Sequence, residues 1–354
     1  MEKFADSHIH FRFLRFDEIE RMLDTIHAEG VTDACLLSLP YRGAAENLTA
    51  LYWKMRYTKM TMRAFGGLHI TDRYCEVPPE IQAEQLLKLG CDGIKIMNAP
   101  SIRNFVGTRI SDPKYHKMYA LLEKNGVPVN MHVNDPRYVW ESGRLDKSYL
   151  SYDEVYAEAL EMLDMFPGLQ ITFAHFFFLS DDPKEAERIM EKYPNVRFDL
   201  TPGGEMFVNF SKDPEYWHEF FTKYSKRLLF GTDSNAIKSC NRELNQMVLK
   251  SLQNSHDEFI QPNVYGRDWK LRGLALDEEV VRRICYDNYK DFVGEVKPVN
   301  KEMFYQCSER VLRDIKENPY DPFYVAGGEV IADLKNDPKQ KISTDFLERV
   351  LAER

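Results

Sequence analysis

Short apolar runs alternate along the chain with longer stretches in which apolar residues recur every three or four positions. Apolar runs of roughly four to eight residues bounded by Gly or Pro predict buried strands, and the longer periodic stretches predict helices. The predicted strands are residues 4–11, 31–39, 63–70, 93–97, 127–133, 169–176, 196–200 and 227–232. Helix signals fall between them: Asp17 is a predicted N-cap, Gly30 ends the first helix, and Asp-Pro pairs at 182–183 and 213–214 open two others.

Eight strand–helix units in a row define the predicted fold. Most of the strands are apolar on both faces, as parallel strands covered by helices are. Reference positions near their carboxyl ends are His10, Leu39, His69, Lys95, His132, His175, Leu200 and Asp233, spaced 25 to 43 residues apart. Units of this size predict a (β/α)8 TIM barrel. The alternative, a doubly wound open sheet, requires a Gly-rich phosphate turn after the first strand, and the sequence has none there.

The residues that follow the eighth unit divide into two parts. Predicted helices near 241–255 and 277–292, separated by an irregular stretch at 257–273, complete the outer ring, so residues 1–296 are predicted to form the barrel domain. Residues 297–354 carry loop signals at 318–322 and 327–328 and predict a helical C-terminal extension packed on the barrel. This extension is also the candidate interface of a homo-oligomer.

Composition narrows the class of protein. Of the 354 residues, 44% are apolar and 29% charged, the balance of a soluble globular protein. The net charge of −9 and the lack of a basic run argue against nucleic acid or an anionic membrane as a partner. No apolar run approaches the ~18 residues of a membrane span. The six cysteines are scattered without a CxxC pair and no apolar leader follows Met1, which predicts a protein of the reducing cytoplasm.

Histidines and one aspartate end several of the predicted strands. His8 and His10 are two residues apart on the first strand and so point to the same face, where two imidazoles can bind one divalent ion. The residues at the ends of later strands are Lys95, His132, His175 and Asp233. In a TIM barrel these ends converge on one face, which predicts a metal site there. The alternative, ordinary core or surface histidines, is disfavoured because histidine is a minority residue in cores and aspartate is seldom buried unless paired.

Four strand motifs and one helix carry a resemblance to a known family. The motifs are Asp6-Ser7-His8-Ile9-His10, Val129-Asn130-Met131-His132, Thr172-Phe173-Ala174-His175 and Phe230-Gly231-Thr232-Asp233, and the helix has an I-x-x-x-N-x-x-x-x-x-G pattern over 284–294. Over residues 4–294 the chain resembles the amidohydrolase superfamily, in particular its amidohydrolase-2 branch. The C-terminal extension lies outside the resemblance.

The resemblance implies a metal centre with assigned ligands. By it, one divalent ion, zinc first with manganese or iron as alternatives, is bound by His8, His10, His132 and Asp233. His175 is a further ligand or hydrogen-bonds the transition-state oxyanion. The ion lowers the pKa of its water towards ~7 and polarises a substrate oxygen, and Asp233 takes the proton of the water and passes it to the leaving group. Asp6 either orients a histidine ligand or caps the start of the strand.

The sequence leaves the roles of Lys95, of His69 at the end of the third strand and of Arg42 in a loop open. Lys95 lies within an apolar strand and has three possible roles. It is a barrel residue whose ammonium reaches solvent, a carboxylated lysine that bridges two metals as in some superfamily members, or an ammonium that binds a substrate carboxylate. One ion is expected rather than two. His69 and Arg42 are the candidate substrate contacts, with a solvated loop position as the alternative for Arg42. Weaker candidates after the fifth strand are Asn134, Asp135 and Arg137.

Three functions compete at this site. The first is a metal-dependent hydrolase that cleaves an amide, ester or lactone-type bond of a small polar substrate through a metal-activated water. The second is a lyase on the same metal site, either a non-oxidative decarboxylase or a hydratase. The third is a catalytically dead barrel that only binds a ligand, which the complete set of candidate ligands argues against. Fold alone does not decide among them.

Overall fold

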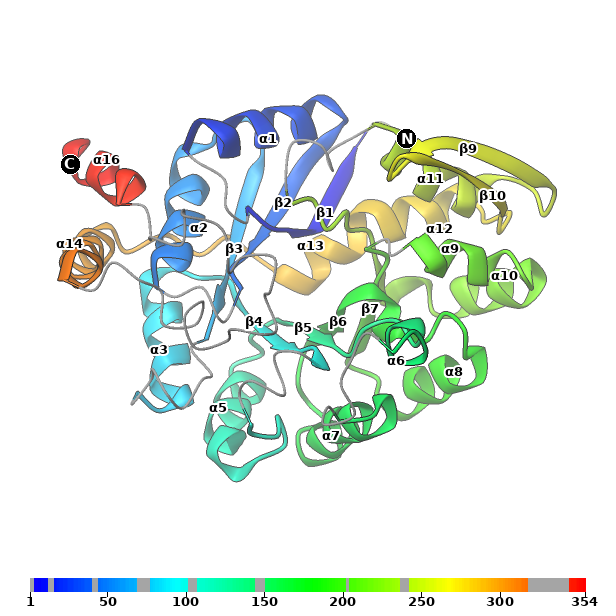
Figure 1. Cartoon of the computed structure of the whole chain (residues 1–354), viewed down its shortest axis with the longest axis horizontal. Coiled ribbons are helices and arrows are strands. Elements are labelled where there is room, and N and C mark those ends of the chain that lie inside the picture. The colour runs from blue at the N-terminus through cyan, green and yellow to red at the C-terminus, as the bar shows by residue number, and fades with distance from the viewer. Residues whose placement is uncertain are drawn as a thin grey trace.

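The computed structural model describes residues 3–11, 16–39, 44–68, 77–100, 107–143, 150–201, 204–235, 242–317 and 344–354. Eight parallel strands follow one another around a single sheet in chain order, with helices on the outside (Figure 1). The strands are β1 (Phe4–Ile9), β2 (Val31–Leu37), β3 (Thr61–Gly67), β4 (Gly93–Asn98), β5 (Val129–Val133), β6 (Ile171–Phe173), β7 (Val196–Asp199) and β8 (Leu228–Leu229). The predicted TIM barrel is confirmed.

Backbone contacts between the first and last strand segments close the barrel. Ser7 N donates to Phe230 O at 3.0 Å, and Asp233 N donates to the carbonyl of His8 at 2.9 Å. An isolated parallel bridge joins Ile9 to Ser234 beyond the end of β8. The C-terminal ends of β1 and β8, which carry candidate ligands, are therefore held directly against each other.

Helices cover the outside of the barrel. Those between the strands are α1 (Phe16–Ala28), α2 (Ala44–Arg56), α3 (Pro79–Leu89), α5 (Pro113–Lys124), α6 (Tyr138–Glu141), α7 (Tyr152–Met165), α8 (Pro183–Lys192), α9 (Gly204–Phe210) and α10 (Pro214–Lys223), with short turns η1 (Ala174–Phe178) and η2 (Ser225–Arg227). Side-chain caps start several of them where the sequence signals lie: Asp182 and Asp213 each accept from a backbone N–H of the first turn, followed by proline.

The barrel interior below the site is filled by a small apolar cluster. Its strand members are Ala5, Cys35, Leu37, Phe65 and Leu229, and Tyr289, Phe292 and Val293 come from α13 (Asn288–Val293). α13 is the last part of a continuous helix with α12 (Glu278–Arg282) and the π-helical segment η4 (Arg283–Asp287), as predicted for 277–292. The larger core lies between the strands and the outer helices. This cluster is apolar, and the buried Asp33–Arg63 pair lies beside it, with the Arg63 guanidinium 5.6 Å from the centre of the Tyr289 ring.

The prediction of an irregular stretch at 257–273 is wrong. It forms an antiparallel hairpin of β9 (Glu258–Val264) and β10 (Arg267–Arg272), which follows α11 (Arg242–Gln253) and packs against α11 and α9. The buried positions are Gln261 and Val264 of β9 and Trp269 and Leu271 of β10. Most of the exposed positions are charged or polar, with Ile260 and Pro262 among them. This composition hides the strand pattern in the sequence, because these strands depend on packing against the neighbouring helices.

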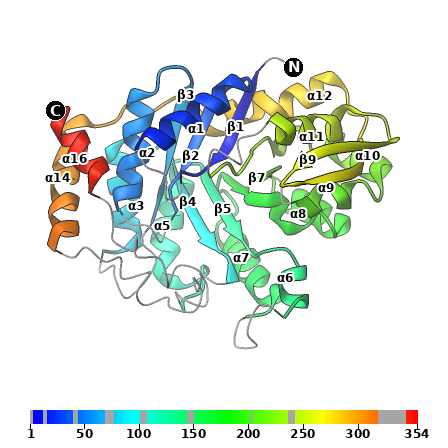
Figure 2. The same ribbon diagram turned by 45° about the horizontal axis from the view of Figure 1, so that its top comes forward.

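Two helices of the C-terminal region pack on the barrel. α14 (Lys301–Glu317) lies on α2 and α3, and α16 (Asp345–Ala352) lies on α2 and α14 (Figure 2). Tyr52 of α2 donates to Glu353 at 2.9 Å, and Phe346 stacks on Phe16. The domain boundary near residue 296 stays a prediction. Among the described helices, none has the length and apolar character needed to cross a membrane.

Candidate metal centre

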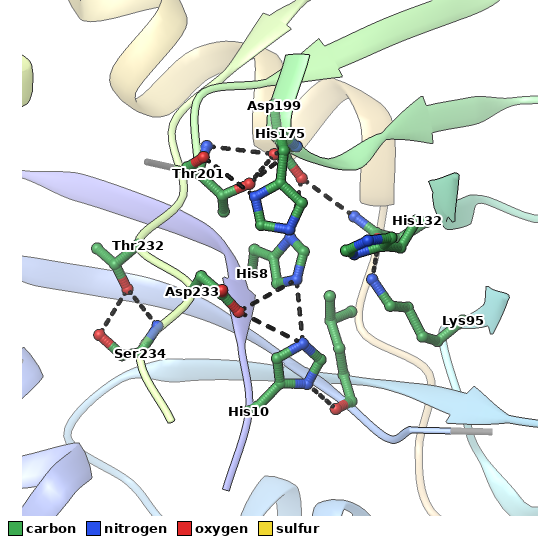
Figure 3. A network of polar contacts seen from close by, with 12 residues as sticks. His8, His10, Lys95, His132, His175, Asp199, Thr201, Thr232, Asp233 and Ser234 are labelled. Atoms are coloured by element: carbon green, nitrogen blue, oxygen red, sulfur yellow. Dashed lines mark hydrogen bonds and ion pairs between the residues drawn. The ribbon is translucent and has the colours of Figure 1, made fainter. Parts of the chain in front are cut away.

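A β-bulge in β1 sets the direction of its two histidines. β1 pairs with β2 in parallel, but between Asp6 and Ile9 it advances three residues while β2 advances two. An extra residue of this kind re-aims side chains and is common beside active sites. His8 and His10 are buried, 1% and 7% exposed, and their rings lie side by side at the open end of the barrel (Figure 3).

Three side chains converge at the C-terminal ends of β1 and β8. The Nε2 atoms of His8 and His10 are 3.1 Å apart, and Oδ1 of Asp233 lies 3.7 Å and 3.6 Å from them. Within the described part of the chain this is the one group whose ligand atoms could hold an ion, all within 4.8 Å of one another. Ligands at about 2.0–2.1 Å from a tetrahedral zinc stand roughly 3.3 Å apart. The observed spacing therefore matches a single ion.

Protein acceptors fix the hydrogens of three imidazoles on Nδ1. The acceptors are the Leu37 carbonyl for His10 (2.7 Å), the Thr201 carbonyl for His175 (3.2 Å) and the Asp199 carboxylate for His8 (3.0 Å). Carbonyl and carboxylate oxygens only accept, so each Nε2 keeps a lone pair. Histidines that bind metal characteristically donate their other N–H in this manner. Two lone pairs facing each other at 3.1 Å beside a carboxylate call for a cation, so the residues present fit a divalent metal.

Burial keeps these imidazoles neutral. Desolvation lowers the pKa of His8 to about 4 and that of His175 to about 3, and it lowers the pKa of His10 well below its usual value. The positive charge of Lys95 adds to the lowering at His8 and His10. Burial raises the pKa of Asp233, whose side chain is one-third exposed at 33%. Near neutral pH the three imidazoles therefore offer lone pairs, the form that binds a metal.

His175 opens a left-handed turn after β6. Residues 175–178 all have φ between 53° and 56°, a conformation that costs roughly 1–2 kcal/mol for each residue other than glycine. Phe176 and Phe177 are fully buried and both contact Phe198 of β7, and their burial offsets the strain. Phe178 stacks on the His175 ring at 5.2 Å between centroids. The turn places the His175 ring 5.5 Å from that of His8.

His132 and Lys95 flank the three-residue cluster. The His132 ring is 4.8 Å from that of His175, and its Nε2 donates to the carbonyl of Asn134 at 2.8 Å, which leaves the lone pair on Nδ1. Lys95 donates from Nζ to Oδ1 of Asn130 at 2.5 Å. Lys95 is 1% exposed, so it does not snorkel to solvent, and burial lowers its pKa to about 8.

Asp199 at the end of β7 is the site residue that sequence reasoning missed. It is fully buried and contacts the ring of His8 and the backbone N–H of His175. Burial alone would raise its pKa, but the neighbouring His8 and His175 and the hydrogen bonds it accepts bring the pKa below its ordinary value. Its signal in the sequence is one acidic residue inside the otherwise apolar 198–200, one position before the reference position Leu200.

Asp6 ties the backbone of β1 to that of the segment after β8. Its carboxylate accepts from the backbone N–H of His8 (3.1 Å) and from the N–H and hydroxyl of Thr232 (3.1 and 2.6 Å). Burial raises the pKa of Asp6 to about 7. Asp6 therefore holds the strand ends that carry His8 and Asp233, and it contacts no imidazole directly among these bonds.

The remaining candidates divide into described and undescribed residues. Arg42 and His69 lie outside the described residues, and their substrate contacts stay predictions. Asp135 approaches Nε2 of His132 at 3.7 Å. Arg137 stacks over Tyr152 at 4.0 Å and pairs with Asp181 at 3.5 Å, so it is held at the rim by protein partners.

The fold and the site together define a class of protein: TIM barrels in which histidines and an aspartate converge at the C-terminal ends of the strands. The family model of the amidohydrolases (Amidohydro_2) matches residues 17–293, most of the chain. The chain belongs to this family, and the resemblance seen in the sequence is confirmed.

Solved structures of similar fold agree with the barrel. A putative amidohydrolase from Staphylococcus aureus has a TM-score of 0.54 at 13% identity and covers 83% of this chain and 100% of its own. The uncharacterised TIM-barrel protein Bb4693 from Bordetella bronchiseptica has a TM-score of 0.54 at 14% identity, covering 83% and 100%. The 4-oxalomesaconate hydratase LigJ from Rhodopseudomonas palustris has a TM-score of 0.53 at 10% identity, covering 87% and 99%. At such low identities the likeness concerns the fold. No curated protein matches the chain in sequence.

Proposed function

We propose that this protein is a metal-dependent hydrolase that cleaves an amide, ester or lactone-type bond of a small polar molecule. The observation that carries the proposal is the convergence of three acceptor atoms, Nε2 of His8, Nε2 of His10 and Oδ1 of Asp233, within 4.8 Å of one another. Membership of the amidohydrolase family supports the same chemistry. Nitrogen donors with one carboxylate suit zinc first, and manganese or iron as alternatives.

His8, His10 and Asp233 would hold the ion, with His175 and His132 as further donors. The Nδ1–H of His175 is engaged by the Thr201 carbonyl, so its Nε2 is an acceptor and suits a ligand better than a donor to an oxyanion. When bound, a divalent ion lowers the pKa of a coordinated water towards ~7 and polarises a substrate oxygen. Asp233 is the general base of the proposal, because its partly exposed carboxylate lies beside the donors and can take a proton and return it to a leaving group.

Lys95 is the proposed contact for a negative group of the substrate. Its ammonium is buried and donates to the neutral Oδ1 of Asn130, which does not cancel its charge. The positive charge of Lys95 also acts on Asp233, where it opposes the rise in pKa that burial causes. An ammonium on the same side of the barrel as the ligands can clamp a substrate carboxylate. We favour this role and a single ion, because the described residues form one three-ligand group and a bridging carboxylated lysine would need a second.

The experiment that tests the proposal measures metal and turnover together. Metal content is determined by plasma mass spectrometry on protein purified without chelator and with bicarbonate present, and the same protein is assayed on panels of lactones, amides and esters. About one ion per chain with turnover that chelator abolishes supports the proposal. About two ions per chain would reassign Lys95 as a carboxylated bridge. A protein that holds no metal after supplementation with zinc, manganese or iron refutes it.

A lyase is the second candidate. A buried ammonium beside a metal centre also suits carboxylate substrates of decarboxylases and hydratases, and one solved structure of similar fold is a hydratase. Release of carbon dioxide from carboxylated aromatic compounds, or hydration of unsaturated carboxylates, with no turnover of the hydrolase panels would favour the lyase.

A further inference from the structure

One buried carboxylate receives hydrogen bonds from two of the candidate ligand residues. Oδ2 of Asp199 is 3.0 Å from Nδ1 of His8, and Oδ1 accepts from the backbone N–H of His175 at 2.9 Å. The remaining donors to this carboxylate are the amide of Asn130 (3.3 Å), the backbone N–H of Thr201 (3.2 Å) and the hydroxyl of Thr201. Asp199 is 0% exposed, so water does not compete for these bonds. Figure 3 shows Asp199 beside Thr201 and the rings of His175 and His8.

The contact with His8 selects one tautomer. An ionised carboxylate has no hydrogen to donate, so Nδ1 of His8 must carry the hydrogen and Nε2 the lone pair. Nε2 is the atom that faces His10 and Asp233. With the opposite tautomer, an N–H would point into the place where an ion would sit. The carboxylate therefore decides whether His8 can act as a ligand.

The contact with His175 holds the start of a strained turn. The left-handed run begins at His175, and the N–H of that residue is bound by Asp199 and by the hydroxyl of Thr201 (3.1 Å). The Thr201 carbonyl in turn accepts from Nδ1 of His175. β7 and its extension thus fix both the backbone and the ring of His175.

We propose that Asp199 is the positioning residue of the metal centre, which sets the tautomer of His8 and anchors the turn that presents His175. The inference rests on the proposed metal-dependent function and deepens it. Asn130 extends the same network, because it receives a hydrogen bond from Lys95 and donates one to Asp199. A change at Asp199 consequently reaches His8, His175 and Lys95 together.

Another buried carboxylate provides a matched control. Asp92 is 1% exposed and accepts from Lys54 at 2.6 Å, from Ala64 N at 2.9 Å and from Lys297 N at 2.9 Å. These partners lie away from the metal centre and join β3, α2 and the segment before α14. Asp92→Asn therefore removes a buried charge with a structural role while it leaves the centre intact.

The first test compares zinc affinity, measured by competition with a chromophoric chelator, for the wild type, Asp199→Asn and Asp92→Asn. An Asn side chain can donate as well as accept, so it no longer enforces the Nδ1–H tautomer, and loss of such a contact typically weakens metal binding by about 10–100-fold. We expect this weakening in Asp199→Asn, and unchanged zinc affinity with reduced thermal stability in Asp92→Asn. Wild-type affinity in a folded Asp199→Asn variant would overturn the inference.

The second test needs neither metal nor a variant of Asp199. Long-range ¹⁵N–¹H correlation spectra of the metal-free, ¹⁵N-histidine-labelled protein report the tautomer of each imidazole, and His8→Gln assigns the His8 signals. We expect the Nδ1–H tautomer for His8 in the wild type. The Nε2–H tautomer would overturn the inference even if Asp199→Asn does not fold. The Nδ1–H tautomer in a protein that binds no zinc would refute the proposed function and leave the role of Asp199 in setting the tautomer standing.

Discussion

Because burial keeps His8 neutral in the folded state, the metal-free protein is predicted to lose stability in acid, where the unfolded chain takes up a proton at this residue. Its folded-state pKa is about 4, and a histidine in an unfolded chain has a pKa near 6.5. Between these values the unfolded state binds more protons than the folded state, so the free energy of unfolding falls as the pH falls. The contribution of His8 to the free energy of unfolding is complete above pH 6.5 and is lost progressively down to pH 4.

The magnitude follows from the two pKa values. For one group with these values, the linkage relation gives a loss of about 2.5 kcal/mol between pH 7.5 and pH 4.5. The profile of the whole protein does not isolate this effect, because Asp6, with its pKa raised to about 7, gains stability as the pH falls. The difference between the wild type and His8→Gln does isolate it, since Gln does not titrate.

Urea denaturation of both proteins in chelator, at pH 7.5 and pH 4.5, measures this difference. The wild type should lose about 2.5 kcal/mol more than His8→Gln between the two pH values. A difference below about 1 kcal/mol would show that burial does not lower the pKa of His8 as far as inferred, and would refute the reasoning that keeps this imidazole neutral well below pH 6.5.

Three further predictions test the metal, the base and the turn. Zinc at about 100 times its Kd should raise the Tm by about 4 °C, because binding adds ~2.7 kcal/mol and the unfolding entropy of 354 residues is about 0.74 kcal/mol/K. Differential scanning fluorimetry should show no such rise in His10→Gln, and an equal rise in that variant would exclude His10 as a ligand. Asp233→Asn should lower kcat/KM by about 10²–10⁴-fold on any substrate found, with circular dichroism unchanged, and full activity would exclude Asp233 as the base. Phe177→Gly should be about 1 kcal/mol more stable than Phe177→Ala in urea denaturation because φ is 56°, and the opposite order would contradict the left-handed turn.

The sequence by itself determined the barrel and most of the candidate centre. Eight apolar runs separated by capped helical stretches define the strand order, because parallel strands buried on both faces need nothing but continuous apolar residues. His8, His10 and Asp233 were found as well, since strand ends meet on one face of a barrel whatever the details of packing. The hairpin at 258–272 was missed because most of its exposed residues are charged or polar, so the strand pattern is weak, and its buried side packs on α9 and α11.

Tertiary structure decided how the ligands are aimed. The bulge between Asp6 and Ile9 depends on the register against β2, which no local pattern records. The left-handed turn at His175 is unfavourable locally and exists because aromatic burial and the hydrogen bond to Asp199 offset its strain. Apart from Thr201, the partners of Asp199 are His8, Asn130 and His175, which lie 24 to 191 residues away in sequence. A single acidic residue at the end of β7 therefore acquires its position in the network only when the barrel closes.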